Sequence, residues 1–421
     1  MLDKILYQVK KIVPKKVFNF LQPYYHRFLS WVGEHIYSRP SGELKVIGVT
    51  GTKGKSTTVY LISRFLREAG KKVGVVGSLG IEIGDQSWPN NLKMTMPGRL
   101  KLQRMLSDMV HVGCEYAVIE VTSEGIAQFR HKGIDFDCAV FTNLSREHIE
   151  VHGSFEKYYE AKQELFKITD NIHILNGDSP YLSLFMSPAK KKIFYSLRDG
   201  FKFSTSLVGD FNKENILAAV SVLRAYGIDE KYAQQALDKI KKISGRMEFI
   251  KREPFEVVID YAHTPDSLEM VYKMFKKGPG VKSEKKLICV LGSAGGGRDK
   301  WKRPIFGEIA SKYCDEIFLT NEDPFDEDPE EILKDIEKGI RNLKFKISNV
   351  HKIIDRKEAI REALIKAKKD DTVVITGKGS ETTMALAEGQ KIPWSERKIV
   401  LELLQKETSG EKHRNSRSSS E

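Results

Sequence analysis

The sequence from Lys45 onward alternates short apolar runs with longer segments of helical periodicity, and this alternation constrains the fold more than any other feature. Runs of strand length occur in the segments KVIGVTG, KVGVVGS, YAVIEVT, CAVFTNL and NIHILNG. Helix-like segments such as STTVYLISRFLREAG and FEKYYEAKQELFKI lie between several of them. This alternation is typical of a mostly parallel sheet with helices on both faces. We therefore predict an α/β domain over residues 46–244.

A second cycle of the same kind follows the junction SGRME at residues 244–248. Strand character is found in FEVVIDYA, KLICVLGS, EIFLTN and TVVITGKG, and helical character in RPIFGEIASKY and PEEILKDIEKGIRNL. A chain of 421 residues is also too long for one ordinary core. We predict a second, smaller, Rossmann-like domain over residues 245–405. The polar residues 406–421 predict a disordered tail.

Residues 1–45 differ from both domains because they combine many aromatic residues with lysines and contain Pro14 and Pro23. This composition predicts short amphipathic helices. Two interpretations remain open: the helices pack on this protein or a partner subunit, or they lie on a membrane surface.

The formal charge of +12 is compatible with nucleic acid, an anionic membrane or an anionic substrate as partner. The sequence contains no aromatic and basic nucleic-acid motif, so we expect a solvated basic surface and no nucleic-acid partner. No apolar run is long enough to cross a bilayer, and the N-terminus lacks the pattern of a signal peptide. We expect a cytoplasmic protein, with the inner face of the membrane as an alternative, and a monomer, with a dimer as an alternative.

The four cysteines lie far apart in the sequence and mostly within apolar runs. Their positions are Cys114, Cys138, Cys289 and Cys314. This pattern predicts buried free thiols in a reducing compartment, and neither a zinc site nor a disulfide.

The turn TGTKGKST connects the apolar run KVIGV to a helix-like segment. Its glycines allow the backbone to approach phosphate oxygens, its lysine supplies a positive charge, and the following serine offers a hydroxyl to magnesium. Val49 stands where the common consensus has its first glycine, so the match is to the shorter pattern GTxGK[ST]. We predict an ATP or GTP site formed by Gly51, Thr52, Gly54, Lys55, Ser56 and Thr57.

Further segments, taken together and in order, resemble the Mur ligases of peptidoglycan assembly, most closely the UDP-N-acetylmuramoyl-tripeptide synthetase (MurE) type. They are GVTGTKGKSTT, IEVTSEGIAQFR, FTNLSREHIEVHG, YYEAKQELF, GDFNKENILAA, SGRME, VIDYAHTPDSLE, GSAGGGRDKWKRP, TNEDPFDEDP and TGKGSE. The resemblance implies a P-loop-type central ATPase domain, a Rossmann-like C-terminal domain, and a ligase that uses ATP and magnesium. Such a ligase activates a carboxylate as an acyl phosphate and joins it to an amine.

The resemblance also assigns roles around the phosphates. Glu120 and His148 would bind magnesium together with Ser56, two ions being expected, and Lys162 matches a lysine that is typically carbamylated. Taken alone, Glu120 reads as a surface carboxylate, His148 as a loop histidine bonded to backbone, and Lys162 as a solvent-facing helix lysine. Acyl-phosphate formation brings two anions together, so fixed cations and metal ions are required near them.

At the other end of the nucleotide, Asn212 and Asn215 match paired asparagines that contact adenine. Amide side chains suit the edge of a base because they can both donate and accept hydrogen bonds. Arg246, Asp260 and His263 match positions that reach the ribose and phosphates. The alternatives are a turn, a helix cap and a capped strand end.

For the incoming amino acid, the resemblance places Arg298 at its carboxylate and Glu381 at an ammonium group, with Gly377 nearby. Diaminopimelate-adding members carry DNPR where this chain has Asp323, Pro324 and Phe325. Because the arginine is missing, and because Asp323 with Glu322 suits a distal cation, we predict lysine or another amine without a distal carboxylate.

On the acid side, the resemblance places the muramyl-peptide at Thr95, Pro97, Ser123 and Arg130. Family members also carry an N-terminal uridine-binding domain that the short segment 1–45 does not match. We therefore expect an acceptor that lacks UDP or is linked to lipid.

Two other functions remain open. The chain could be an ATP-using amidating subunit that acts on a lipid-linked cell-wall peptide with a glutaminase partner. It could also be a nucleotide-binding protein without catalysis, although Lys55, Glu120, His148 and Lys162 are all present.

Overall fold

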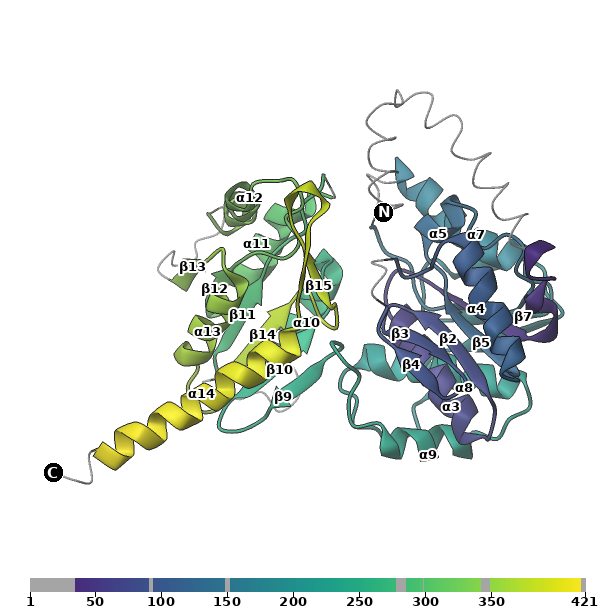
Figure 1. Ribbon diagram of the computed structural model, residues 1–421, viewed down its shortest axis with the longest axis horizontal. Coiled ribbons are helices and arrows are strands. Elements are labelled where there is room, and N and C mark those ends of the chain that lie inside the picture. The colour runs from purple at the N-terminus through teal and green to yellow at the C-terminus, as the bar shows by residue number, and fades with distance from the viewer. Residues whose placement is uncertain are drawn as a thin grey trace. The chain divides into compact units, whose positions relative to one another are not determined.

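The computed structural model describes residues 35–90, 94–147, 152–277, 285–297, 299–341 and 349–417. We predicted amphipathic helices for residues 1–45. Of this segment the structure describes residues 35–45, and the rest of the prediction lies outside the described residues. The chain divides into two compact units, which Figure 1 draws with the N-terminal unit in purple to teal and the C-terminal unit in green to yellow. The first unit comprises Met1–Leu144, Phe155–Thr205 and Asp210–Lys239, and the second comprises Ser145–Ser154, Ser206–Gly209 and Ile240–Glu421. Among the described residues, no helix is both long and apolar enough to span a membrane.

The first unit is built on an eight-stranded sheet whose inner strands are parallel. In sheet order the strands are β4 (Gln86–Trp88), β3 (Gly80–Ile83), β2 (Val73–Gly77), β5 (Tyr116–Glu120), β1 (Lys45–Thr50), β6 (Phe136–Phe141), β7 (Ile172–Asn176) and β8 (Lys191–Tyr195). Only β3 and β4 run antiparallel to their neighbours. Because β1 lies between β5 and β6, the loop after β1 is flanked by the carboxyl ends of both.

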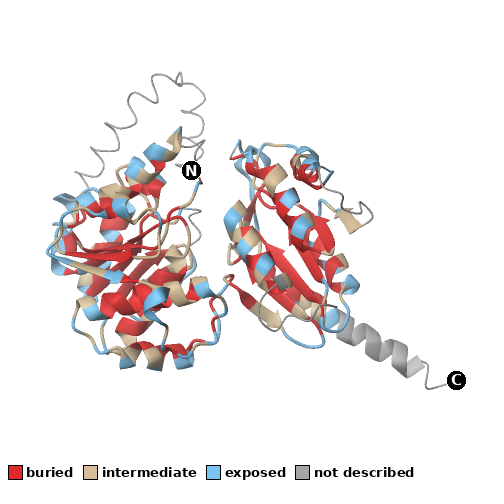
Figure 2. Cartoon of the chain, turned by 180° about the vertical axis from the view of Figure 1, so that it is seen from behind, coloured by how far each residue is buried: buried red, intermediate tan, exposed pale blue. Residues whose placement is uncertain are grey.

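Helices cover both faces of this sheet (Figure 1). One face carries α3 (Lys55–Glu68), α8 (Asp210–Ala225) and α9 (Lys231–Lys239). The other carries α4 (Arg99–His111), α5 (Ser123–Ala127) and α7 (Phe155–Lys167), whose apolar side chains form one core cluster with the strands. Burial on both sides explains why the central strands are continuous apolar runs, and Figure 2 shows them buried throughout.

The second unit has a six-stranded sheet that is parallel except for one edge strand. In sheet order the strands are β13 (Val350–Lys352), β12 (Glu316–Leu319), β11 (Leu287–Leu291), β14 (Thr372–Thr376), β10 (Glu256–Asp260) and β9 (Glu248–Lys251). One face carries α10 (Pro265–Lys277), α11 (Lys302–Tyr313) and α12 (Pro329–Arg341), and the other α13 (Arg356–Lys366) and α14 (Glu396–Arg417). A hairpin of β15 (Thr383–Ala385) and β16 (Lys391–Pro393) follows β14. The predicted α/β class, with a P-loop-type unit followed by a Rossmann-like unit, is confirmed.

Helix α14 begins at Glu396, and its first turns are anchored by Val400 and Leu403 in the core of the second unit. The domain limits predicted from the sequence, with a disordered tail at residues 406–421, stay a prediction.

One expectation, that of four free cysteines, needs correction. Cys289 and Cys314 form a disulfide, although we expected four free thiols. They are 25 residues apart in sequence, but α11 returns the chain to the neighbouring strand and brings their Cα atoms to 6.1 Å. Cys114 and Cys138 are free and buried, as predicted.

Candidate functional site

The loop between β1 and α3 contains two glycines that no other residue could replace without strain. Gly51 has φ +147°, and a Cβ there would lie 2.0 Å from the hydroxyl of Thr142. Gly54 has φ +79°, and its Cβ would lie 2.2 Å from the side-chain oxygen of Asn215. Left-handed backbone and close approach together favour glycine. The loop is therefore held tightly against β6 and α8.

Asn143, which follows β6, fixes the middle of this loop. The backbone N–H of Thr52 donates to the Asn143 carbonyl at 2.8 Å, and that of Lys53 donates to its side-chain oxygen at 2.8 Å. Lys55 opens α3 and folds back over the loop, where its Nζ donates to the carbonyls of Gly51 and Thr52 at 2.9 and 2.8 Å. A positive charge and a helix N-terminus thus meet at one turn, an arrangement that suits phosphate.

Glu120 ends β5 beside the loop, because the β1–β5 register pairs it with Val49. Its carboxylate accepts the Ser56 hydroxyl at 3.0 Å, and also the backbone N–H and hydroxyl of Ser78, each at 2.9 Å. The two hydroxyls lie 2.7 Å apart. Glu120 is buried, so it is not the surface carboxylate that its sequence context alone suggests.

Hard oxygen ligands of this kind fit Mg²⁺, which usually keeps several waters and takes only one or two protein carboxylates. Among the residues that the structure describes, no cluster of three His, Cys, Asp or Glu side chains could hold a metal ion alone. His148, the other predicted ligand, lies outside the described residues.

Lys162 points from α7 into the loop. Its side chain is 2% exposed, and its Nζ donates to the Gly51 carbonyl at 2.7 Å. The Tyr158 ring lies 4.6 Å from this Nζ, and the Tyr158 hydroxyl is 3.0 Å from that of Thr52. Lys162 is thus part of the phosphate loop's surroundings and not a solvent-facing lysine.

The predicted adenine and acid-side residues are also grouped in the first unit. Asn212 and Asn215 are both buried on α8, and Asn215 accepts the Thr58 hydroxyl at 3.3 Å. The Arg130 guanidinium donates to the Met96 carbonyl, between Thr95 and Pro97. Met96 in turn packs on α5, which Ser123 opens.

In the second unit, Asp260 ends β10 with both oxygens engaged by backbone. Oδ2 accepts the N–H of Met247 at 2.7 Å, and Oδ1 that of Ala262 at 2.8 Å. Burial raises the pKa of Asp260, although these donors and Arg246 oppose the shift. The Arg246 guanidinium lies 4.3 Å from the Tyr261 ring centre, and the His263 Nδ1 lies 2.7 Å from the Tyr261 carbonyl. The three predicted residues are therefore brought together around Asp260 and Tyr261.

The predicted amino-acid residues gather at the carboxyl ends of β12 and β14. Asp323 and Glu381 both pair with Lys378, whose side chain is fully buried. A Cβ on Gly377, which has φ +105°, would lie 2.5 Å from Oε2 of Glu322. That oxygen is buried, and no described residue donates a hydrogen bond to it. Arg298 lies outside the described residues.

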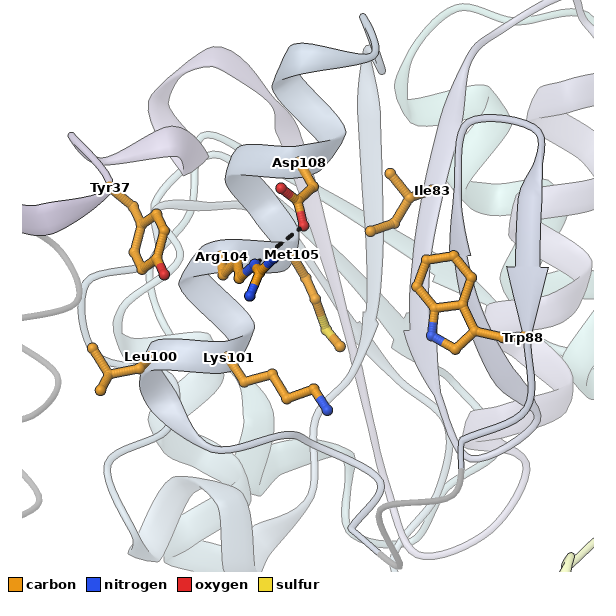
Figure 3. A pocket seen from close by; sticks show the side chains of 8 residues that line it. All are labelled: Tyr37, Ile83, Trp88, Leu100, Lys101, Arg104, Met105 and Asp108. Atoms are coloured by element: carbon orange, nitrogen blue, oxygen red, sulfur yellow. Dashed lines mark ion pairs between the residues drawn. The ribbon is translucent and has the colours of Figure 1, made fainter.

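A pocket of about 530 Å³ lies elsewhere in the first unit, over α4 and the β3–β4 hairpin (Figure 3). Ile83, Trp88 and Leu100 supply apolar lining, while Lys101 and Arg104 supply positive charge. None of the described site residues predicted from the sequence lines this pocket.

Several residues of the site were missed by the sequence reasoning. They are Ser78, Asn143, Tyr158 and Lys378. Each stands in or beside a quoted motif or strand end, so proximity to a motif was the only available signal.

Comparison with known proteins is consistent with this geometry. A family model described as the Mur ligase middle domain matches residues 49–200, and one described as the Mur ligase, glutamate ligase domain matches residues 245–379.

Similar sequences include two proteins named UDP-N-acetylmuramoyl-L-alanyl-D-glutamate–2,6-diaminopimelate ligase. That of Caldanaerobacter subterraneus subsp. tengcongensis is 37% identical over 402 residues, covering 89% of this chain and 80% of the relative. That of Clostridium acetobutylicum, ligase 1, is 38% identical over 405 residues with the same coverage. A solved structure of a ligase with this name aligns at 31% identity and TM-score 0.57 over 87% of this chain and 79% of that one. The Escherichia coli FolC–ADP structure, at 19% identity and TM-score 0.63 over 82% and 90%, shares the fold.

Proposed function

This chain belongs to the Mur ligase family and is an ATP-dependent, amide-bond-forming ligase of the MurE type; we propose that it adds a diamino acid without a distal carboxylate to a muramyl-peptide acceptor. The observation that supports the ATP-dependent chemistry is the convergence of Lys55 and Lys162 on the Gly51 carbonyl, beside Glu120. A cation at Lys55, a carboxylate at Glu120 and a lysine that could carry a carbamate surround the phosphate loop, and this set suits a reaction in which two anions meet beside metal ions.

Bound ATP supplies the phosphoryl group that activates the acceptor carboxylate, and magnesium supplies additional positive charge. Lys55 and the α3 N-terminus would hold the phosphates. Ser56 and Glu120 would hold the metal ion, with Ser78 fixing the Glu120 carboxylate in place. Asn212 and Asn215 would bind adenine, and Arg246, Asp260 and His263 the ribose and phosphates.

Lys162 has two possible states in this proposal. As an ammonium it donates to the Gly51 carbonyl, as it does here. As a carbamate it would be an anion, would be repelled by that carbonyl, and would require a metal ion beside it. We propose the carbamate for the loaded enzyme, with two magnesium ions, and its test is a bicarbonate-dependent ¹³C signal that a Lys162→Arg variant lacks.

For the amine, the relatives' names specify 2,6-diaminopimelate. In this chain Phe325 takes the place at which the resemblance puts the arginine for the distal carboxylate, and its ring faces Gly296. An apolar ring gives a carboxylate no partner, and an unpaired buried charge is costly. Glu322, with its buried and unpaired Oε2, is suited to an ammonium group. Lysine or a similar diamino acid therefore fits better than diaminopimelate.

The experiment is phosphate release from ATP with a matrix of amino acids and acceptors. L-lysine, meso-diaminopimelate and ammonia would each be combined with UDP-linked and lipid-linked muramyl peptides. We expect release that requires both an acceptor and an amino acid, with lysine preferred. A clear preference for diaminopimelate would refute the amine assignment, and release driven by ammonia alone would favour an amidating enzyme. The acceptor arms decide between a UDP-linked and a lipid-linked substrate.

A further inference from the structure

The fully buried ammonium of Lys378 lies between two carboxylates of the second unit. Its Nζ donates to Oδ1 of Asp323 at 2.9 Å and to Oε2 of Glu381. The Lys378 side chain is 0% exposed, so water cannot replace either partner. Burial alone lowers the pKa of Lys378, but the carboxylates of Glu381 and Asp323 outweigh it and raise the pKa overall. Lys378 therefore remains charged.

Both carboxylates connect Lys378 to other segments. Oδ1 of Asp323 also accepts the N–H of Ala385 at 2.6 Å, and the Asp323 carbonyl accepts the N–H of Gly295 at 2.8 Å. Oε1 of Glu381 accepts the Tyr261 hydroxyl at 3.2 Å. One lysine thus ties together the loops after β10, β11, β12 and β14.

The glycine-rich loop after β11 packs directly on the loop after β12. A Cβ on Gly295 would lie 2.1 Å from the Pro324 carbonyl, and one on Gly296 would lie 3.2 Å from the Phe325 ring. A displacement of Asp323 would therefore move the glycine-rich loop as well, because no free space separates them.

Charge counting then singles out Glu322. The single charge of Lys378 is shared between Asp323 and Glu381, whereas no described residue donates a hydrogen bond to Oε2 of Glu322. The cations around Glu322 act on it only at a distance, and its burial raises its pKa despite Lys302, Arg356 and Lys378. A buried carboxylate without a donor is suited to a ligand that brings one.

We propose that Lys378 is a positioning residue for the amino-acid site: it occupies Asp323 and Glu381, fixes the four loops, and leaves Glu322 as the carboxylate that accepts the incoming ammonium group. This deepens the proposed function and rests on it. It also changes the role of Asp323, which the sequence suggested as a direct partner of the distal cation and which is occupied by the chain's own lysine.

The test compares Lys378→Met with Lys378→Arg, and with Lys312→Met as a matched control. Lys312 is also an ion-paired lysine of the second unit, but it is exposed and pairs with Glu269 on the surface. We expect Lys378→Met to raise the KM for the amino acid at least about tenfold, since small misplacements in a site have large effects, with the KM for ATP changed less than about twofold. Lys378→Arg keeps the charge and should recover part of the loss, and Lys312→Met should match the wild type.

A folded Lys378→Met protein with an unchanged KM for the amino acid would overturn the inference. Because loss of Lys378 leaves the buried Asp323 and the partly buried Glu381 without their cation, that variant can fail to fold, and Glu322→Gln then provides the second arm. Glu322→Gln removes a charge without a donor, so it should keep the wild-type melting temperature while raising the KM for the amine at least about tenfold. An unchanged KM in Glu322→Gln would also sink the inference. Failure of the proposed function looks different: the wild type itself would then show no amino-acid-dependent phosphate release.

Discussion

The Nζ atom of Lys162 lies 2.7 Å from the carbonyl oxygen of Gly51, although 111 residues separate them in sequence. The contact joins α7 to the phosphate loop and gives the loop a second cation besides Lys55. Two lysines on one carbonyl cannot both be explained by stabilising that carbonyl, because Lys55 alone would do so. The second lysine is better explained by the chemistry at the loop, where the proposed carbamate of Lys162 would hold magnesium beside the phosphates.

Replacing Lys162 with methionine should therefore reduce ATP-dependent phosphate release by at least about 100-fold, because methionine cannot form the carbamate that would hold magnesium beside the reacting phosphates. Steady-state assays with saturating acceptor and amino acid would measure this. Lys167→Met is the matched control, since Lys167 lies on the same helix but is exposed. Equal activities of the two variants would remove Lys162 from the site.

Gly54→Ala should abolish measurable ATP binding while leaving the chain folded. A Cβ at this position meets the Asn215 oxygen at 2.2 Å, and φ +79° is unfavourable for alanine. Gly70→Ala is the control: it has φ +76° at the end of α3, but nothing lies within 4 Å of its Cβ. Gly70→Ala should cost only about 1 kcal/mol of stability and bind ATP normally. Isothermal titration with ATP analogues separates the two, and similar ATP affinities would show that the close approach is irrelevant.

The sheets could be predicted from the sequence because strands buried on both faces are apolar along their whole length, as in YAVIE and LICVL. The phosphate loop could be predicted because its chemistry is local: Gly51, Gly54, Lys55 and Ser56 lie within six positions. Local patterns of this kind need no knowledge of what the chain later brings beside them.

The remaining features depend on contacts between distant positions. Cys289 and Cys314 meet only because α11 connects adjacent strands. Ser78 meets Glu120 only because β2 pairs with β5. The sequence around Lys378 gives no sign of its buried pair with Asp323, because the two residues follow different strands, β14 and β12. Periodicity and motif spacing carry no information about these partners.

The disulfide determines how many cysteines should react with a thiol reagent. Titration of the denatured protein with a thiol reagent should detect two thiols, Cys114 and Cys138, before reduction, and four after it. Reduction should also destabilise the second unit by about 3 kcal/mol, given the length of the closed loop. Four thiols in the unreduced protein, handled without reductant throughout, would contradict the pairing.

Burial of the His131 side chain should make the folded protein less stable in acid. Burial, followed by Lys132, lowers its pKa from 6.5 to about 4, while Glu164 opposes the shift only weakly. The folded state therefore binds this proton less readily than the unfolded state. Stability should fall as the pH drops from 6.5 to about 4, by roughly 3 kcal/mol in all, and should change no further below that range on account of His131.

The measurement is urea denaturation at several pH values between 7 and 4, compared with His131→Leu. Leucine has no proton to gain, so this part of the pH dependence should disappear. The control His111→Leu alters an exposed histidine of the same unit and should keep the wild-type slope. A His131→Leu protein with an unchanged slope would show that other groups cause the acid sensitivity.

The Arg356–Glu396 pair predicts the largest effect on the fold of the second unit. Both side chains are 0% exposed, and the Nε–Oε1 distance is 2.6 Å. Arg356 also donates to the carbonyls of Asn321 and Thr376, at 2.9 and 2.7 Å, and so holds the ends of β12 and β14.

Arg356→Met alone leaves Glu396 buried without its partner and should cost about 3–5 kcal/mol of stability. Adding Glu396→Leu removes the stranded charge and should recover much of that loss, whereas Arg361→Met, which breaks an exposed pair with Glu358, should cost under about 1 kcal/mol. Chemical denaturation of the three variants measures these differences, and a double variant no more stable than Arg356→Met would mean that the two carbonyl contacts, and not the ion pair, carry the stabilisation.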